Sequence, residues 1–324
     1  MSASLLSAAL LVLAVQQTPE EMSTLALLKS TFLPQSKKQS SSPQPMKIIS
    51  AGAGRTGTSS LKTALSRLGL KTYHMKDGVM DTPGHDTVWM EYSEAEKLKR
   101  GNPELLRAII DKMAADGFNA TTDMPACILY NELMKQYPDA RVILSVRSSP
   151  EVWASSVLST IGRNANVLSR VPWRWITFMR QFLSFLDWMW AEFGLDIEED
   201  FDRETLLPKH DALVKAHEAW VARVKRSVPS GKLLVFQPTD GWRPLCDFVS
   251  PVDAQIAAAC EEVLASGEPY PHVNDSSTIK GTLAVFIAIS YMVLASPLLL
   301  VACCVIRMRR RAAPPKGRTG VKRA

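Results

Sequence analysis

Cysteine and histidine are scarce in this 324-residue chain, and their scarcity excludes several kinds of site. The five cysteines show no CxxC spacing and the five histidines form no cluster with them, so neither a zinc site nor a disulfide framework is expected. Acidic residues are absent after residue 306, where eight of the 38 basic residues lie. The rest of the chain has 30 basic and 32 acidic residues, which argues against a folded domain that binds nucleic acid.

Charge is also absent from Gly281 to Ile306, a run of 26 residues that contains Pro297. About 20 apolar residues suffice for a helix to cross a bilayer. The run is followed at once by Arg307-Met-Arg-Arg-Arg311, and such basic clusters belong on the cytoplasmic side. We therefore predict a transmembrane helix over 281–306 and a basic cytoplasmic tail over 307–324.

A second apolar run, Leu5–Val15, has the length of the core of a signal peptide, although no Lys or Arg precedes it. Residues 17–45 are rich in Ser, Gln, Pro and Lys and are typical of a linker. A signal peptide over 1–16 would place the folded domain in an endomembrane lumen such as the Golgi, or at the cell surface, on a single-pass anchor. The competing topology is a tail-anchored protein with a cytosolic domain.

Between the linker and residue 275, short apolar strands alternate with amphipathic helices. Strands are expected at 46–51, 71–75, 141–147 and 232–236, and helices at 59–68, 103–116, 126–137, 150–160, 172–193 and 208–228. This alternation predicts an α/β fold, a P-loop NTPase-like three-layer sandwich in which helices cover both faces of a central parallel sheet. We assign this domain to residues 46–275.

A glycine-rich turn joins the first expected strand to the first helix, with the sequence Gly52-Ala-Gly-Arg-Thr-Gly-Thr-Ser-Ser60. In such a turn, backbone N–H groups approach an anion closely and the helix N-terminus adds positive potential. The letters match a dinucleotide fingerprint, but the second strand ends in His74-Met-Lys76 rather than in an acid. The Walker A glycine spacing is also present, yet Thr58 replaces its lysine, which disfavours an ordinary kinase or NTPase.

A second element supports a third interpretation. The strand 141–147 ends in Arg147, and Ser155 follows eight residues later in a helix. The loop and this Arg–Ser pair together resemble the two phosphate-binding elements of the sulfotransferases, in the branch of sulfotransferase-like proteins of uncertain substrate. Other segments that resemble this branch are Tyr73-His-Met75, Thr122-Asp-Met-Pro125, Tyr130-x-Glu-Leu133, Leu233–Phe236, Asp240–Cys246 and Tyr270–Asp275.

The resemblance implies that 3′-phosphoadenylyl sulfate is the co-substrate and that a sulfuryl group is transferred to a hydroxyl or amine, with no metal. The residues that it implies for donor binding are Gly54, Arg55, Thr56, Gly57, Thr58, Ser59, Arg147 and Ser155. Arg55 replaces the lysine common in this loop, so it would also carry the charge that neutralises the leaving phosphate. A kinase-like nucleotide-binding protein and a catalytically inactive membrane-anchored scaffold remain the alternatives.

Two residues compete for the role of general base. His74 follows the second strand where the loop opens, and its near-neutral intrinsic pKa suits proton transfer. Asp123 precedes Pro125 where related enzymes place substrate-facing groups. We favour His74 and keep Asp123 open.

Aromatic residues crowd the stretch from 172 to 193. They are Trp173, Trp175, Phe178, Phe182, Phe185, Trp188, Trp190 and Phe193. A helical core explains them most simply, while an acceptor lid or a membrane-facing surface would suit a lipid acceptor. The acceptor itself, whether a carbohydrate, a lipid or a small molecule, is not fixed by the sequence.

Overall fold

The computed structural model describes residues 45–98, 102–169, 173, 176–273, 280–281 and 283–292. The predicted signal peptide, almost all of the linker and the basic tail therefore lie outside the described residues, as does most of the predicted transmembrane run 281–306. In the part of the chain that is described, no helix is both long enough and apolar enough to span a membrane.

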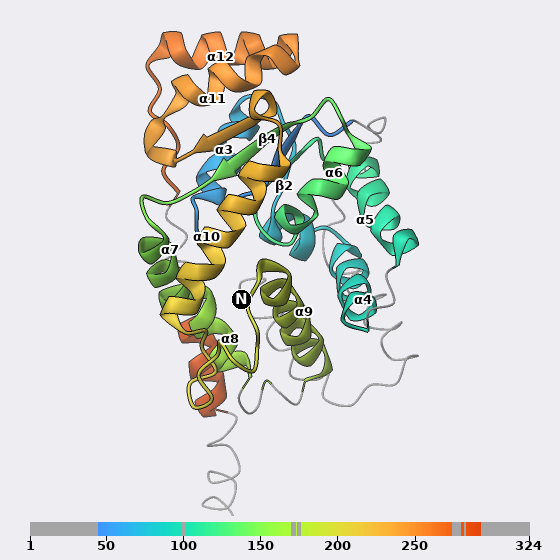
Figure 1. Cartoon of the computed structure of the whole chain (residues 1–324), viewed down its shortest axis with the longest axis vertical. Helices are drawn as coiled ribbons and strands as arrows, with labels where there is room; N and C mark the ends of the chain where they lie inside the picture. The colour runs from blue at the N-terminus through green and yellow to red at the C-terminus, as the bar shows by residue number, and fades with distance from the viewer. Residues whose placement is uncertain are drawn as a thin grey trace, which may run out of the picture.

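A sheet of five strands forms the centre of the domain, in the order β2-β3-β1-β4-β5 with every neighbouring pair parallel (Figure 1). The strands are β1 (Ile48–Ser50), β2 (Thr72–Tyr73), β3 (Ala120–Thr121), β4 (Arg141–Ser145) and β5 (Leu233–Phe236). This confirms the α/β class and the central parallel sheet. Strand β3 was not predicted, because its two residues are too few to show an apolar period. Strand β4 ends at Ser145, two residues before Arg147.

Helices follow each strand in the chain. They are α3 (Thr58–Arg67), α4 (His85–Lys97), α5 (Pro103–Ala115), α6 (Tyr130–Gln136), α7 (Pro150–Val157), α8 (Arg163–Leu168), α9 (Thr177–Phe193), α10 (His210–Ser227), α11 (Trp242–Val249) and α12 (Ala254–Ser266). The helix expected over 150–160 continues beyond α7 as a π-helix, η3 (Leu158–Gly162). The strand expected to reach Met75 is shorter, because a second π-helix, η1 (Met75–Met80), begins there.

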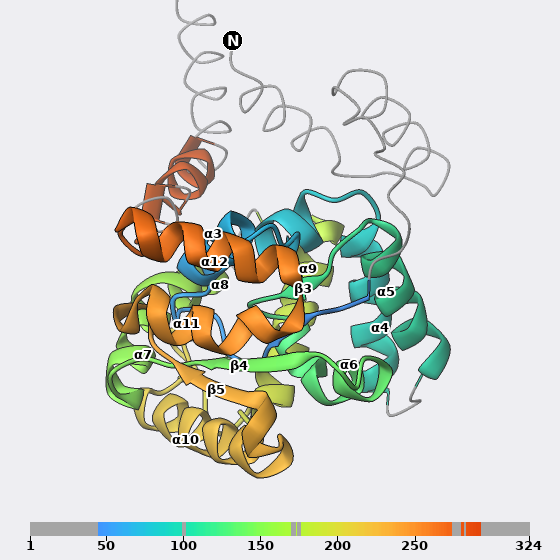
Figure 2. The same cartoon turned by 90° about the horizontal axis from the view of Figure 1, so that it is seen from above.

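The alternation of β1 shows that both faces of the sheet are covered. Ile48 packs into the cluster formed with α3, α11 and α12, whereas Ile49 packs into the larger cluster that includes α7, α9 and α10. Successive side chains of a strand point to opposite faces, so one strand contributes to two cores. Figure 2 shows β4 and β5 between α10 on one side and α11 and α12 on the other. The predicted three-layer arrangement is therefore present in the described residues.

Local signals set the start of α7, the helix that carries Ser155. The Ser149 hydroxyl accepts the backbone N–H of Val152 at 3.3 Å, and Pro150 occupies the first turn. A hydroxyl cap satisfies a free N–H of the first turn, and proline fits there because its own N–H is not needed. The position of α7 is thus fixed close to the end of β4.

Strand β2 is anchored from its buried side by a polar network. The Tyr73 hydroxyl accepts the indole N–H of Trp89 at 2.9 Å and lies 2.9 Å from His85 Nδ1. His85 is 1% exposed, and its Nε2 lies 2.8 Å from a carboxylate oxygen of Asp116. Each buried polar group of this network is paired, as low-dielectric surroundings require.

Asn119, one of two glycosylation sequons in the sequence, is not available in the folded domain. Its side chain is buried, and its amide oxygen accepts the backbone N–H of Lys71 at 2.8 Å. The second sequon, at Asn274, lies outside the described residues.

A buried histidine in α10 makes the fold sensitive to acid. His217 is 4% exposed, its ring contacts that of Trp153 with centroids 4.7 Å apart, and its Nδ1 has no hydrogen-bond partner among the described residues. Burial disfavours the charged ring and lowers the pKa of His217 from its ordinary value of 6.5 to about 4. Burial also lowers the pKa of His85, although Asp116 opposes the shift.

We expect stability to decline as the pH falls from 6.5 toward 4, because the unfolded chain takes up protons that folded His217 does not. The shift corresponds to a loss on the order of 3 kcal/mol across this window. Urea unfolding of wild type, His217→Phe and His272→Gln at several pH values tests this. The slope should flatten in His217→Phe and stay unchanged in His272→Gln, whose histidine is exposed; an unchanged slope in both variants would contradict the assignment.

Candidate functional site

The glycine-rich loop lies at the carboxyl end of β1, where the sheet's connections change sides. Ligands of parallel α/β sheets bind at such a point. A Cβ atom on Gly52 would lie 1.9 Å from Ser145 Oγ, and one on Gly57 would lie 2.3 Å from Pro238 Cγ. Gly57 also has φ 90°, and Arg55 adopts the left-handed region at φ 72°. Backbone turns of this kind gather N–H groups into an anion-binding concavity.

Two buried tryptophans hold the loop by its carbonyl groups. The indole N–H of Trp153, in α7, donates to Gly54 O at 2.8 Å, and the indole N–H of Trp220, in α10, donates to Ala51 O at 2.8 Å. Both rings are at most 2% exposed. With their carbonyls bound on the protein side, these peptide units are fixed in orientation. Neither bond could be predicted from the sequence, because the bonded residues lie 99 and 169 positions apart.

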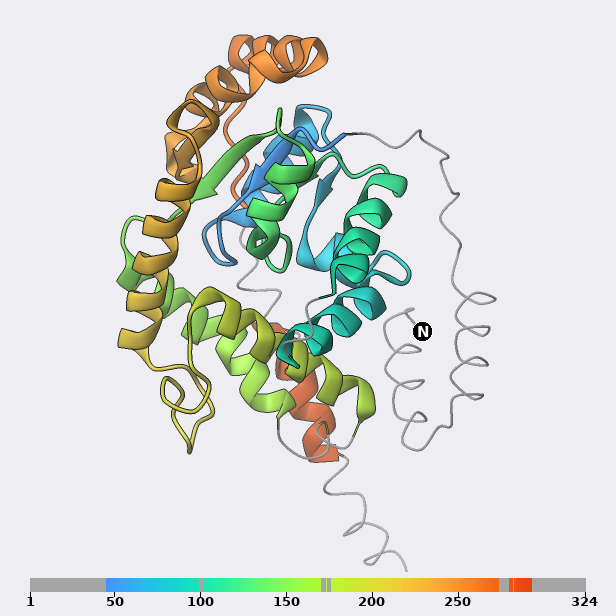
Figure 3. The ribbon, with the colours of Figure 1, turned by 45° about the vertical axis from the view of Figure 1, so that its right-hand side comes forward.

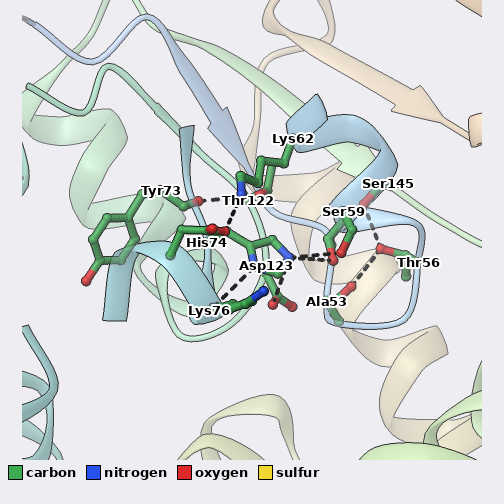
Figure 4. A network of polar contacts seen from close by, with 12 residues as sticks. Ala53, Thr56, Ser59, Lys62, Tyr73, His74, Lys76, Thr122, Asp123 and Ser145 are labelled. Atoms are coloured by element: carbon green, nitrogen blue, oxygen red, sulfur yellow. Dashed lines mark hydrogen bonds and ion pairs between the residues drawn. The ribbon is translucent and has the colours of Figure 1, made fainter. Parts of the chain in front are cut away.

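The Thr56 hydroxyl is used within the loop. It donates to Ala53 O at 2.6 Å and lies 2.6 Å from Ser145 Oγ, with the residue fully buried. Thr56 therefore shapes the loop and connects it to the end of β4 (Figure 4). Ser60 directly follows the residues predicted to bind the co-substrate. Its hydroxyl accepts the backbone N–H of Val273 at 3.0 Å, so the segment after α12 runs along the start of α3.

His74 and Asp123, far apart in the sequence, meet at the mouth of the loop (Figure 4). His74 Nε2 lies 3.3 Å from Asp123 Oδ2, 3.3 Å from Ser59 Oγ and 3.5 Å from Thr58 Oγ1. They come together because β2 and β3 are neighbouring parallel strands, whose carboxyl ends share one edge of the sheet. The structure thus unites both predicted base candidates with two of the predicted donor-binding hydroxyls.

The protonation of His74 follows from its second nitrogen. Nδ1 accepts the backbone N–H of Lys76 at 3.3 Å, so in the neutral ring the proton is on Nε2 and points toward Asp123. The Asp123 carboxylate is the acceptor of this pair. Its position is equally specific: φ is 71°, and a Cβ atom on Gly54 would lie 2.8 Å from Asp123 Oδ1. Asp tolerates this left-handed backbone better than most residues, at a cost of about 1 kcal/mol.

The other predicted donor residues lie along β4 and α7. Arg55 Nε donates to Ser156 Oγ at 3.3 Å, which draws the arginine toward α7. Arg147 Nε is buried and has no hydrogen-bond partner among the described residues. Ser155 is exposed, and its hydroxyl lies 3.5 Å from His210 Nε2 rather than against Arg147. A buried guanidinium N–H without a partner suits an anionic ligand.

Among the residues that the structure describes, no group of three or more His, Cys, Asp or Glu side chains could hold a metal ion. The positive charge near the loop is supplied by arginine side chains, the loop N–H groups and the N-terminus of α3. These groups are suited to a phosphate or phosphosulfate.

Comparison with known proteins agrees with this geometry. The family model described as a sulfotransferase domain matches residues 47–279, a range that contains the loop, His74, Asp123 and Arg147. The Ava biosynthesis cluster protein M of Aspergillus versicolor is 31% identical over 210 residues, covering 63% of this chain and 76% of that protein. The chain therefore belongs to the sulfotransferase domain family and is a transferase.

Proposed function

We propose that the protein transfers a sulfuryl group from 3′-phosphoadenylyl sulfate to a hydroxyl or amine of an acceptor. The observation that carries the proposal is the pairing of a cationic, N–H-lined loop with the Asp123–His74 pair at its mouth. The loop binds the negatively charged phosphosulfate, and the Asp123–His74 pair accepts the proton of the acceptor. Sulfuryl transfer needs both at the same place.

The donor is held at both of its phosphate ends. Arg55, the loop N–H groups and the hydroxyls of Thr58 and Ser59 bind the 5′-phosphosulfate, aided by the N-terminus of α3. Arg147 binds the 3′-phosphate, which is supported by its buried Nε without a partner among the described residues. Ser155, exposed on the same side as His210, adds a hydroxyl to that end.

Transfer proceeds by in-line displacement at sulfur. A lone pair on the acceptor oxygen or nitrogen forms the new bond to sulfur while the bond from sulfur to the 5′-phosphate oxygen breaks. The electron pair of that bond leaves on the phosphate, whose charge Arg55 and the loop N–H groups stabilise. The acceptor proton passes to the Asp123–His74 pair, and the products are the sulfated acceptor and 3′-phosphoadenosine 5′-phosphate.

Within the pair, we assign the proton acceptor to Asp123 and a positioning role to His74, reversing the preference that the sequence favoured. The bond from Lys76 N–H to Nδ1 leaves no free lone pair on the neutral ring. A base must offer a lone pair toward the acceptor, and the Asp123 carboxylate retains one. His74 then fixes the carboxylate through Nε2 and organises Ser59.

The first prediction concerns the donor. Calorimetric titration with 3′-phosphoadenosine 5′-phosphate should show affinity about 10- to 100-fold weaker in Arg55→Ala and Arg147→Ala, because each removes charge-assisted hydrogen bonds. Arg147→Ala should not affect adenosine 5′-phosphate, which lacks the 3′-phosphate. Arg107→Ala, whose side chain is 78% exposed on α5, serves as the matched control. Preference for ATP or NAD in the wild type would return the loop to a kinase-like or dinucleotide role.

The second prediction separates the two base candidates. With transfer to water followed as sulfate release, Asp123→Asn should slow turnover about 10²- to 10⁴-fold and abolish the acid limb of the pH profile. His74→Gln should slow it less and keep that limb, since the amide still donates toward Asp123. An acid limb lost in His74→Gln and kept in Asp123→Asn would make His74 the base. Donor binding without turnover in the wild type would indicate an inactive scaffold.

The third prediction concerns placement in the cell. We propose a single-pass membrane protein, anchored through the uncharged run 281–306, with the domain in an endomembrane lumen or at the cell surface. Because residues 283–292 pack on the domain, we place them at the membrane surface and the residues after them in the bilayer. In sealed microsomes, an epitope tag after Ala324 should be digested by added protease while the domain 46–275 stays protected. A protected tag with a digested domain would establish the tail-anchored topology instead.

A further inference from the structure

A helix that follows the domain in the chain packs back onto it beside the aromatic stretch. Residues 283–292 are helical, and Phe286 and Ile289 pack against the apolar cluster of Leu168, Trp173, Ile176 and Met179. Leu283 is also buried. Figures 1 and 3 show this orange-red helix against α8. We call residues 283–292 the docked helix.

The docked helix is held by polar as well as apolar contacts. The rings of Trp173 and Phe286 meet edge to face with centroids 4.8 Å apart. The indole N–H of Trp173 donates to Ser290 Oγ at 2.7 Å, and the Ser290 hydroxyl donates to Phe286 O at 2.8 Å. A buried indole that is both packed and hydrogen-bonded fixes the rotation of the helix about its axis. One defined face therefore points outward.

That outward face is apolar. Val285, Ile287, Tyr291 and Met292 are 57%, 37%, 71% and 62% exposed. No charged residue interrupts the helix, and none follows it in the sequence until Arg307. Large apolar side chains gathered on one exposed face indicate a surface that is covered by a partner.

The sequence of the following residues indicates which partner covers it. Residues 293–306 extend the uncharged run, and Arg307-Met-Arg-Arg-Arg311 ends it. An apolar helix face that continues into a long uncharged run bounded by arginines fits the hydrocarbon and headgroup layers of a lipid bilayer. A protein partner could cover the outward face without the long uncharged run that follows it.

The docked helix also lies close to the candidate active site. After Asp123, the side chain nearest to a Cβ atom on Gly54 would be Ile161, in η3, at 3.6 Å. Leu168, at the end of α8, belongs to the cluster against which the docked helix packs. Leu168 follows Ile161 by seven positions of continuous helical backbone, about 10 Å at the usual rise per residue. The segment that borders the loop at one end thus contacts the docked helix at the other.

We propose that the outward face of the docked helix sits in the membrane surface and turns the acceptor side of the site toward it, so that the acceptor is a membrane-embedded amphiphile. Its headgroup hydroxyl takes the sulfuryl group and gives its proton to Asp123, with the bonds made and broken as in the proposed reaction. This inference rests on the proposed function for its chemistry and on the docked helix for its substrate class.

The test begins with membrane binding, which requires no turnover. Full-length protein should float with vesicles of zwitterionic phosphatidylcholine, which excludes capture by the arginine cluster alone. The double variant Val285→Glu, Met292→Glu should lose at least ten-fold in flotation, since carboxylates resist insertion into lipid. Leu98→Glu, at an equally exposed apolar residue that directly follows α4, is the matched control and should float normally. Equal flotation of the double variant would overturn the proposal.

A second arm identifies the acceptor class. With sulfur-labelled donor and vesicles of total microsomal lipid, label should appear in the lipid extract for the wild type and the Leu98→Glu variant, and at least ten-fold less for the double variant. Transfer to water and donor affinity should stay the same in all three. Label found only in water-soluble products would overturn the inference and leave the sulfotransferase activity standing, whereas failure to bind the donor would refute the proposed function itself.

A second copy of the chain is the competing occupant of the outward face. A wild-type dimer in lipid-free detergent that becomes monomeric in the double variant would assign the face to self-association and overturn the membrane proposal. A monomer in both would support it.

Discussion

The site depends on two hydrogen bonds that point away from any ligand. Trp153, in α7, and Trp220, in the adjacent α10, bind the carbonyls of Gly54 and Ala51, so the peptide units around the loop cannot rotate freely. A carbonyl held on the protein side leaves the neighbouring N–H groups free to face an anion. Preorganised donors of this kind need no rearrangement when charge develops, which is how electrostatic stabilisation lowers a barrier.

The same tryptophans explain why α7 and α10 are placed together. The Phe193 ring contacts both, with its centroid 5.3 Å from that of Trp153 and 4.9 Å from that of Trp220, and the His217 ring also contacts Trp153. This aromatic group joins the loop to the helices that carry Ser155 and His210. The glycine-rich loop and the core are therefore held by the same side chains, so a substitution among them will affect both.

Much of this architecture could be predicted from the sequence, and the rest fails for physical reasons. The apolar run of β4 and the glycine loop are local signals, and both were found. Strand β3 is two residues long, too short for any period to show, and helices α4, α8, α11 and α12 were not predicted. The meeting of His74 with Asp123 depends on strand order, which a single sequence does not state. Which of them holds the proton depends on one backbone N–H, that of Lys76.

The position of His74 depends on residues that lie behind the sheet, because His74 directly follows Tyr73, the last residue of β2. Tyr73 points into the core, where Trp89 and His85 hold its hydroxyl, while the next residue, His74, points to the loop. The contacts that fix Tyr73 therefore also fix the direction of the His74 side chain. In a screen for loss of activity, harmful substitutions will therefore include residues of α4, although these residues do not line the loop.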